Sequence, residues 1–131
     1  MTRITIDELK KRTRSTTPKK SRPIEQDLTR EILQALTMQL GIVCWRNNSG
    51  VMPAEYKGKQ RFIHMSPTGS PDIFGILPGG KLFGLEVKMA RGKQSVKQMA
   101  WETMMKRKGA CYGVVRSIDE AIQSVRQWKA T

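Results

Sequence analysis

The spacing of apolar residues changes along the 131-residue sequence, and each change predicts a different structural element. Residues 24–40 carry apolar side chains at steps of three and four, which predicts a helix with one buried face. These side chains are Leu28, Ile32, Ala35, Leu36 and Leu40. Pro23 suits the first turn of this helix and Gly41 suits its end.

Extended runs bounded by turn residues follow this helix. Short apolar stretches between clusters of Asn, Ser, Gly and Pro are typical of strands. The predicted strands are residues 42–46, 71–77 and 81–88, with a further extended run at 61–65 and a loop at 51–60. Pro78-Gly79-Gly80 turns the chain back between two of these strands and predicts a hairpin.

The C-terminal part of the sequence predicts a helix, a strand and a second helix. Ser95 and Gln98 form a capping box for a helix that runs to about Lys108. Residues 110–116 are apolar and predict a buried strand, and residues 118–128 return to helical spacing. The whole pattern predicts an α/β fold, in which a mixed β-sheet is flanked by helices in the order α-β-β-β-α-β with a C-terminal helix.

The net charge of the sequence indicates what kind of partner the protein binds. The sequence has 24 Lys and Arg against 11 Asp and Glu, a formal net charge of +13. Such an excess is typical of proteins that bind a polyanion, and nucleic acid is the first candidate, although a basic protein without a specific partner is the alternative. Residues 1–23 hold eight Lys or Arg and two acids. We therefore expect a basic, flexible tail over residues 1–22 and one domain over residues 23–131.

Some classes of protein do not fit the composition. There is no apolar run long enough for a membrane span, and the charged N-terminus lacks the apolar core of a secretory signal, so we expect a cytoplasmic location. Cys44 and Cys111 have no metal-ligand spacing, and His64 is the single histidine. A cysteine–histidine metal site and histidine-based catalysis are therefore not expected.

Three charged residues of the predicted hairpin can meet in space. Glu86 and Lys88 share one face of a strand, whereas Leu85 and Val87 point to the other. Asp72, at the start of the neighbouring strand, can face Glu86. Two converging carboxylates repel unless a cation lies between them, and their oxygens suit Mg²⁺ or Mn²⁺. With the adjacent Lys88 ammonium, the two carboxylates and a bound cation can hydrolyse a phosphodiester. For Glu86 and Lys88 alone, a salt bridge between strands is the simpler interpretation.

These residues resemble the signature of the PD-(D/E)xK nuclease superfamily and, within it, the stand-alone phage or bacterial form of the VRR-NUC family. The matching residues are Gly69-Ser70-Pro71-Asp72-Ile73, Leu85-Glu86-Val87-Lys88, Gln98, Gly109 and Val115-Arg116. The resemblance covers residues 24–126 and implies a restriction-endonuclease-like core. Ser117 stands where the family has a second arginine, so the role of this strand end is left open.

The resemblance implies a metal site and a catalytic set. The implied catalytic residues are Asp72, Glu86, Lys88 and Gln98, and the implied metal ligands are Glu25, Asp72, Glu86 and the backbone carbonyl of Val87. Glu25 can instead be an acid favoured by the helix dipole. Gln98 can instead be only the capping partner of Ser95, and we do not expect one side chain to serve both purposes.

Basic and polar residues near the predicted site are candidate DNA contacts. Arg46-Asn47 resembles a polar motif of the family that can touch phosphate, although a surface turn is the alternative. Arg91, Lys93 and Lys97 follow the Glu-x-Lys strand and are expected to bind backbone phosphates.

The sequence thus predicts a Mg²⁺-dependent (or Mn²⁺-dependent), structure-selective DNA endonuclease in a bacterial or phage-infected cell. The resemblance points to branched DNA such as Holliday junctions. One site per chain implies a homodimer for paired cuts. Met52, Trp101 and Met105 are expected to be apolar residues beyond the needs of the core, which also favours a dimer. The alternatives are a non-catalytic DNA-binding module with the same fold, and a nuclease for ordinary duplex DNA.

Overall fold

A computed structural model describes residues 24–48, 51–64 and 66–131 of the chain. The predicted N-terminal tail lies outside these residues. Three helices and six strands are described: α2 (Ile24–Leu40), β1 (Val43–Arg46), β2 (Val51–Tyr56), β3 (Lys59–His64), β4 (Ile73–Ile76), β5 (Leu82–Val87), α3 (Val96–Arg107), β6 (Cys111–Val115) and α4 (Ile118–Lys129).

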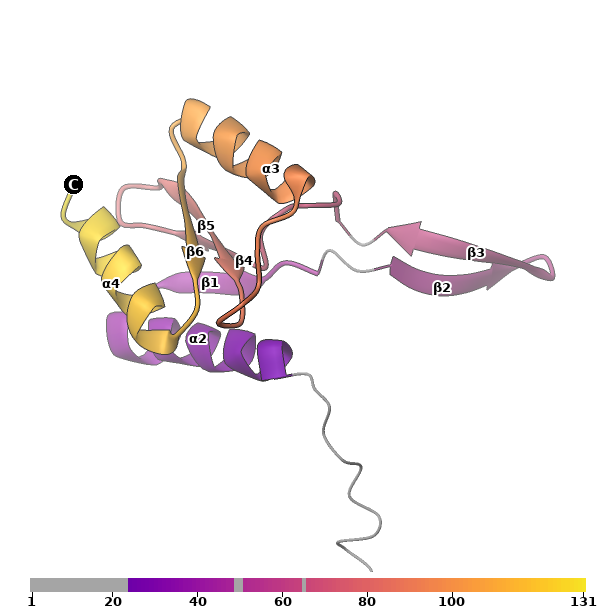
Figure 1. Ribbon diagram of the computed structural model, residues 1–131, viewed down its shortest axis with the longest axis horizontal. Coiled ribbons are helices and arrows are strands. Elements are labelled where there is room, and N and C mark those ends of the chain that lie inside the picture. The colour runs from indigo at the N-terminus through magenta and orange to yellow at the C-terminus, as the bar shows by residue number, and fades with distance from the viewer. Residues whose placement is uncertain (1–23, 49–50, 65) are drawn as a thin grey trace, which may run out of the picture.

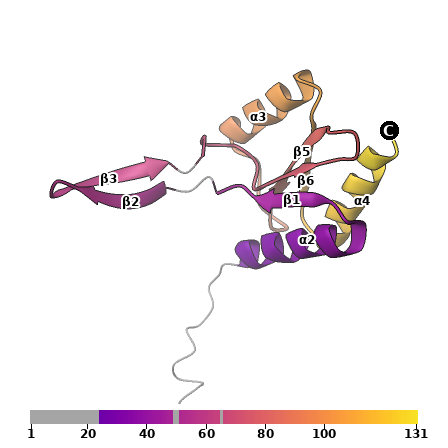
Figure 2. The ribbon, with the colours of Figure 1, turned by 180° about the vertical axis from the view of Figure 1, so that it is seen from behind.

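Four strands form the central sheet, in the order β1-β4-β5-β6. β1, β4 and β5 are antiparallel, whereas β5 and β6 are parallel. A parallel pair needs a crossover connection, which α3 provides. α3 lies on one side of the sheet, and α2 and α4 pack together on the other (Figures 1 and 2). The predicted fold class, a mixed sheet flanked by helices, is confirmed.

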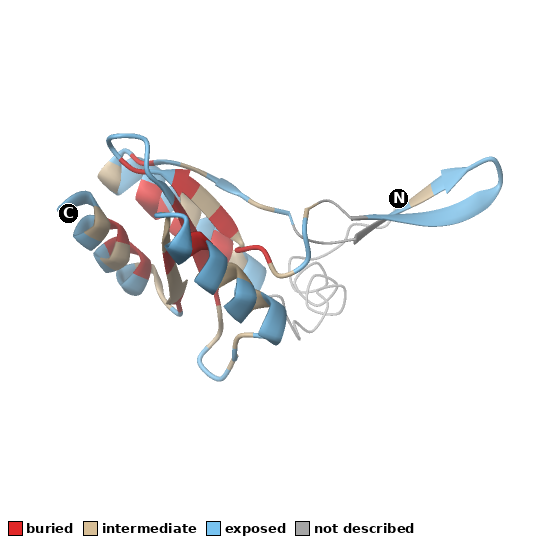
Figure 3. Cartoon of the chain, turned by 90° about the horizontal axis from the view of Figure 1, so that it is seen from above, coloured by how far each residue is buried: buried red, intermediate tan, exposed pale blue. Residues whose placement is uncertain are grey.

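Alternate residues of β5 serve two different environments. Phe83, Leu85 and Val87 are fully buried in the apolar core that the sheet forms with α2 and α4. Glu86 points to the opposite side, where Gln98 of α3 binds it. Buried positions accordingly concentrate along the central strands in Figure 3. The alternation expected from the sequence thus places one carboxylate in the interior beneath α3.

The α3 side of the sheet is only partly covered. Val43 is 64% exposed, Trp45 43%, Ile76 42% and Leu82 38%. Val43 pairs with Ile76, which pairs with Leu82, so these side chains form an apolar row across β1, β4 and β5. Trp45 lies in the next row, opposite Phe74, and their rings are 6.4 Å apart. We call these five residues the uncovered sheet face.

Residues 51–64 form a second, two-stranded sheet, and the expectation of a loop at 51–60 is wrong. Lys57 and Gly58 have φ angles of 52° and 75°, which are the left-handed values of a two-residue hairpin turn. Lys-Gly is not among the usual Asn-Gly and Asp-Gly signals, so the sequence did not reveal the turn. The hairpin projects away from the central sheet (Figure 1).

Element boundaries otherwise follow the predictions closely. α2 has the predicted bounds, and Ser95 and Gln98 make both hydrogen bonds of the predicted capping box at the start of α3. None of the described helices is both long and apolar enough to cross a bilayer.

Candidate active site

The antiparallel pairing of β4 and β5 brings Asp72 to Glu86. Ile73 pairs with Leu85, so the residue before Ile73 lies beside the residue after Leu85. Asp72 Oδ2 accepts a hydrogen bond of 2.8 Å from the backbone N–H of Val87. This bond holds the Asp72 carboxylate against β5. The hairpin predicted that Asp72 would lie beside Glu86, and the pairing places it there.

Glu86 is a buried acid with one satisfied oxygen. The residue is 2% exposed. Its Oε1 accepts a hydrogen bond of 2.8 Å from Gln98 Nε2 and lies 4.0 Å from Lys88 Nζ. Within the described part of the chain, its Oε2 is buried and has no hydrogen-bond donor. Such an orphaned oxygen is costly unless a proton or a cation completes it.

The surroundings of Glu86 favour its neutral form. Burial raises the pKa of its carboxyl to about 9, helped by the adjacent Asp72 carboxyl, with which a proton can be shared, and by repulsion from the Asp72 charge. Lys88 acts in the opposite direction, and Glu25 adds a smaller repulsion. Two carboxylates can only accept hydrogen bonds, so they can approach this closely only by sharing a proton or a cation.

Gln98 has two roles that the sequence analysis treated as exclusive, and that expectation is wrong. Its Oε1 accepts 2.8 Å from the Ser95 backbone N–H in the capping box, while its Nε2 donates to Glu86. Both are possible because an amide has separate donor and acceptor ends. The start of α3 is thereby connected directly to the buried carboxylate.

Asn47 positions the loop that carries Asp72. Its backbone N–H donates to the Asp72 carbonyl at 2.7 Å. Its side-chain Nδ2 donates to Ser70 Oγ at 2.7 Å and to the Pro71 carbonyl at 2.8 Å. A side-chain contact from Asn47 to DNA stays a prediction, whereas its support of this loop is direct.

Gly69 lets the same loop reach α3. Its φ is 89°, and a Cβ atom there would lie 2.7 Å from Lys97 Cβ. Only glycine combines this backbone conformation with so close an approach. The loop before Asp72 and the first turn of α3 are therefore in contact.

Arg116 is a supporting residue that the sequence analysis did not assign. Its Nη1 donates to the carbonyls of Met89 and Gly92, at 2.6 and 2.8 Å. A Cβ atom at Gly92 would lie 3.3 Å from Lys88 Cδ, so the loop passes close beside the lysine stem. Arg116 thus fixes the turn next to Lys88. The match of Val115-Arg116 to the family motif was the available signal.

The remaining predicted site residues lie at the surface. Glu25 is exposed in the first turn of α2. Over residues 24–48, 51–64 and 66–131, no three His, Cys, Asp or Glu side chains converge as a metal cluster. The roles of Glu25 and of the Val87 carbonyl as metal ligands therefore stay predictions. The side chains expected to bind phosphate are likewise exposed: Arg46, Arg91, Lys93 and Lys97.

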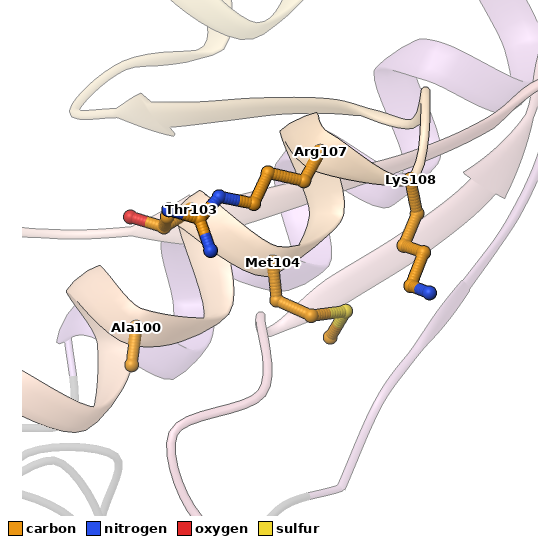
Figure 4. Close-up of a pocket in the computed structure, with 5 residues that line it drawn as sticks. All are labelled: Ala100, Thr103, Met104, Arg107 and Lys108. Carbon is orange, nitrogen blue, oxygen red and sulfur yellow. The ribbon is translucent and has the colours of Figure 1, made fainter.

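A shallow hollow of about 580 Å³ lies on the outer side of α3 (Figure 4). Its lining is apolar and basic: Ala100, Thr103, Met104, Arg107 and Lys108. Trp101 is half-buried next to it. Met105, expected as surplus apolar surface, is only 3% exposed, so that expectation is wrong for Met105.

Comparison of the chain with known proteins identifies a similar fold but no matching family. No family model and no curated protein matches the chain. A solved structure described as "VRR_NUC domain" superposes with a TM-score of 0.55 at 21% identity, over 79% of this chain and 96% of that one. The chain therefore has a fold similar to that of this domain, in agreement with the fold that the resemblance in the sequence implied.

Proposed function

We propose that the protein is a metal-dependent DNA endonuclease that hydrolyses phosphodiester bonds with Asp72, Glu86 and Lys88. The observation that carries the proposal is the buried Glu86 carboxylate, whose Oε2 has no donor in the described structure and which faces Asp72. An acid in this state is expensive to keep for stability alone. Its position beside Lys88 on a nuclease-type fold supports a catalytic purpose.

The donor set fits a hard divalent cation. Asp72 and Glu86 would hold Mg²⁺ or Mn²⁺, with the Val87 carbonyl and Glu25 as further candidate ligands. When bound, such an ion lowers the pKa of a coordinated water and neutralises charge on the phosphate. The ion would offset the energetic cost of burying Glu86 Oε2 without a hydrogen-bond donor.

The neighbouring residues have separate tasks. The Lys88 ammonium, 4.0 Å from Glu86 Oε1, would orient the attacking water or stabilise charge that develops on the phosphate. Gln98 keeps the Glu86 carboxylate in one rotamer through its 2.8 Å hydrogen bond. Asn47 and Arg116 hold the two loops on which Asp72 and Lys88 depend.

DNA is the proposed substrate because the chain carries a net charge of +13. Exposed Arg91, Lys93 and Lys97 lie in the segment between Lys88 and the first turn of α3. Cations at these positions would hold the backbone of the strand to be cut.

We further propose that the protein works as a homodimer on branched DNA. The uncovered sheet face supports this, because a row of exposed apolar residues on a sheet is typical of a surface that another chain covers. A two-fold pair would hold two sites at a fixed spacing, which suits paired cuts in a junction.

Cleavage of labelled DNA tests the catalytic proposal. Flap, fork, four-way junction and plain duplex are incubated with Mg²⁺, Mn²⁺, Ca²⁺ or EDTA. We expect cutting with Mg²⁺ and Mn²⁺, and about a hundred-fold or greater loss in Asp72→Asn, Glu86→Gln and Lys88→Ala, with DNA binding kept. Asp119→Asn and Lys129→Ala, exposed on α4, are the matched controls. Full activity in EDTA contradicts the metal mechanism, and binding without any cutting supports a non-catalytic module.

The dimer is tested by sedimentation equilibrium. Val43→Lys with Ile76→Lys should produce a folded monomer, since both side chains are already exposed. Met38→Lys on α2, where the side chain is 75% exposed, should leave the dimer intact. A wild-type monomer at micromolar concentration contradicts the dimer, and preferential cutting of plain duplex contradicts the choice of branched DNA.

A further inference from the structure

The β2–β3 hairpin is an arm with exposed large side chains. It forms its own two-stranded sheet and extends away from the central sheet in three views (Figures 1, 2 and 3). Phe62 is 68% exposed, Tyr56 60% and Ile63 47%. A lone two-stranded hairpin is marginally stable in water, so a binding partner would stabilise such an arm.

Cations gather on one face of the arm. Tyr56 pairs with Lys59, and Ala54 pairs with Arg61, so these side chains share a face. The Tyr56 ring lies 5.9 Å from the Arg61 guanidinium and 5.5 Å from Lys57 Nζ at the turn. We call Tyr56, Lys57, Lys59 and Arg61 the basic face. The other face carries Pro53, Glu55, Gln60 and Phe62.

The base of the arm is attached beside the candidate active site. Before the arm, the Asn47 backbone N–H donates to the carbonyl of Asp72. After the arm, the Ser66 hydroxyl donates to the Asn48 carbonyl. The two hydrogen bonds hold Asn48 and Ser66, which lie on either side of the arm in the sequence, close to one of the proposed catalytic carboxylates.

We propose that the arm lies along the duplex next to the cleavage site, with its basic face on phosphates that border the major groove. This rests on the proposed function for the position of the cut, but its binding chemistry is independent of catalysis. A two-stranded ribbon fits the major groove, which is about 12 Å wide. Three cations and one acid among the described arm residues match a polyanion. A second copy of the arm is a poorer occupant, since two basic faces repel.

The length of the arm sets its footprint. Each strand has six residues. At about 3.3 Å per residue the arm spans about 20 Å, which corresponds to about six base pairs. Because the contacts are with phosphates, the arm would add affinity without sequence preference.

Salt-dependent binding in EDTA tests the proposal without any cleavage. Lys59→Ala with Arg61→Ala removes two cations from the basic face. The slope of log affinity against log salt should fall by about 1.8 units, and affinity should fall about sixty-fold at about 0.1 M salt. Arg126→Ala with Lys129→Ala removes the same charge from α4, at the opposite end of the molecule from the arm (Figure 1), and should leave the slope unchanged. An equal fall in both variants, or none in the first, overturns the proposal.

A footprint in EDTA gives a second readout. Replacing residues 52–63 by a short Gly-Ser linker should shorten the protected duplex by about six base pairs on one side. Circular dichroism would verify that the linker variant remains folded. An unchanged footprint overturns the proposal. A different pair of results would also overturn it: Phe62→Ser converts a dimer to a monomer, and the basic-face variant keeps the full salt slope. The arm would then bind a second copy of the chain. If wild-type protein never cuts DNA but the slope and footprint change as expected, the arm proposal stands and the nuclease proposal fails.

Discussion

Glu86→Gln should make the metal-free protein more stable, and increasingly so as the pH rises. In the native wild type, the pKa of Glu86 is raised to about 9 from its ordinary value of 4.5. Between these values the folded state holds a proton that the unfolded state has released. The free energy of unfolding therefore falls with increasing pH over this window, and the stabilising contribution of the neutral carboxyl is complete only below about pH 4.5.

The size of the effect follows from linkage. One group contributes at most about 1.4 kcal/mol per pH unit, so the wild type should lose up to about 2.7 kcal/mol between about pH 6 and 8 through Glu86. For a domain of this size, that is about 10 °C in Tm. The introduced amide is uncharged, can still accept from Gln98 and can donate to Asp72, so this pH dependence should disappear.

Urea unfolding followed by circular dichroism in EDTA measures the difference. The gap between Glu86→Gln and wild type should widen from pH 6 to pH 8, by up to about 2.7 kcal/mol. Glu31→Gln, a substitution of an exposed acid on α2, controls for the loss of one negative charge. Mg²⁺ should stabilise the wild type and narrow the gap, because it binds the native state. Parallel pH profiles for wild type and Glu86→Gln would refute the assignment of Glu86 as a buried, neutral acid.

Other consequences can be measured separately. Gln98→Ala should lower cleavage about ten-fold or more and destabilise the fold by about 1 kcal/mol, since it removes the hydrogen bond to Glu86 and half of the capping box. An unchanged kcat would show that Gln98 serves only as a helix cap. Gly75→Ala should cost about 1–3 kcal/mol in urea unfolding, because its Cβ would lie 2.1 Å from the Phe83 ring; wild-type stability would contradict the close approach. Deleting residues 1–20 should weaken DNA binding and lower its salt slope with the domain still folded; loss of the fold would instead place the segment in the core.

Local patterns were enough to predict most elements of the central domain. The four-residue steps of α2 and the capping box of α3 involve neighbours within one turn, so the sequence contains the whole signal. Alternation along β5 predicted correctly that Leu85 and Val87 enter the core on the face opposite to Glu86. The approach of Asp72 to Glu86 was also predictable, because a hairpin fixes which residues lie side by side.

Tertiary structure alone decided the features that depend on distant partners. The bond from Gln98 to Glu86 exists because α3 crosses over β5, and its length and direction follow from packing. Asn47 supports Asp72 through residues more than twenty positions away along the chain. Spacing in the sequence cannot show such contacts, because they arise when separate elements meet.

The projecting hairpin and the uncovered sheet face show the same limit. The turn at Lys57-Gly58 uses two left-handed residues, one of which is not a usual residue for that conformation. Val43 and Ile76 resemble core residues in their strands, but they are exposed because α3 packs against β6, at the other edge of the sheet from β1. Apolar character is a property of the residue, but burial is a property of its neighbours. For this protein the sequence therefore determined most of the elements and the residue types of the candidate site, while the assembled fold decided how those residues are supported and which apolar and basic surfaces remain exposed.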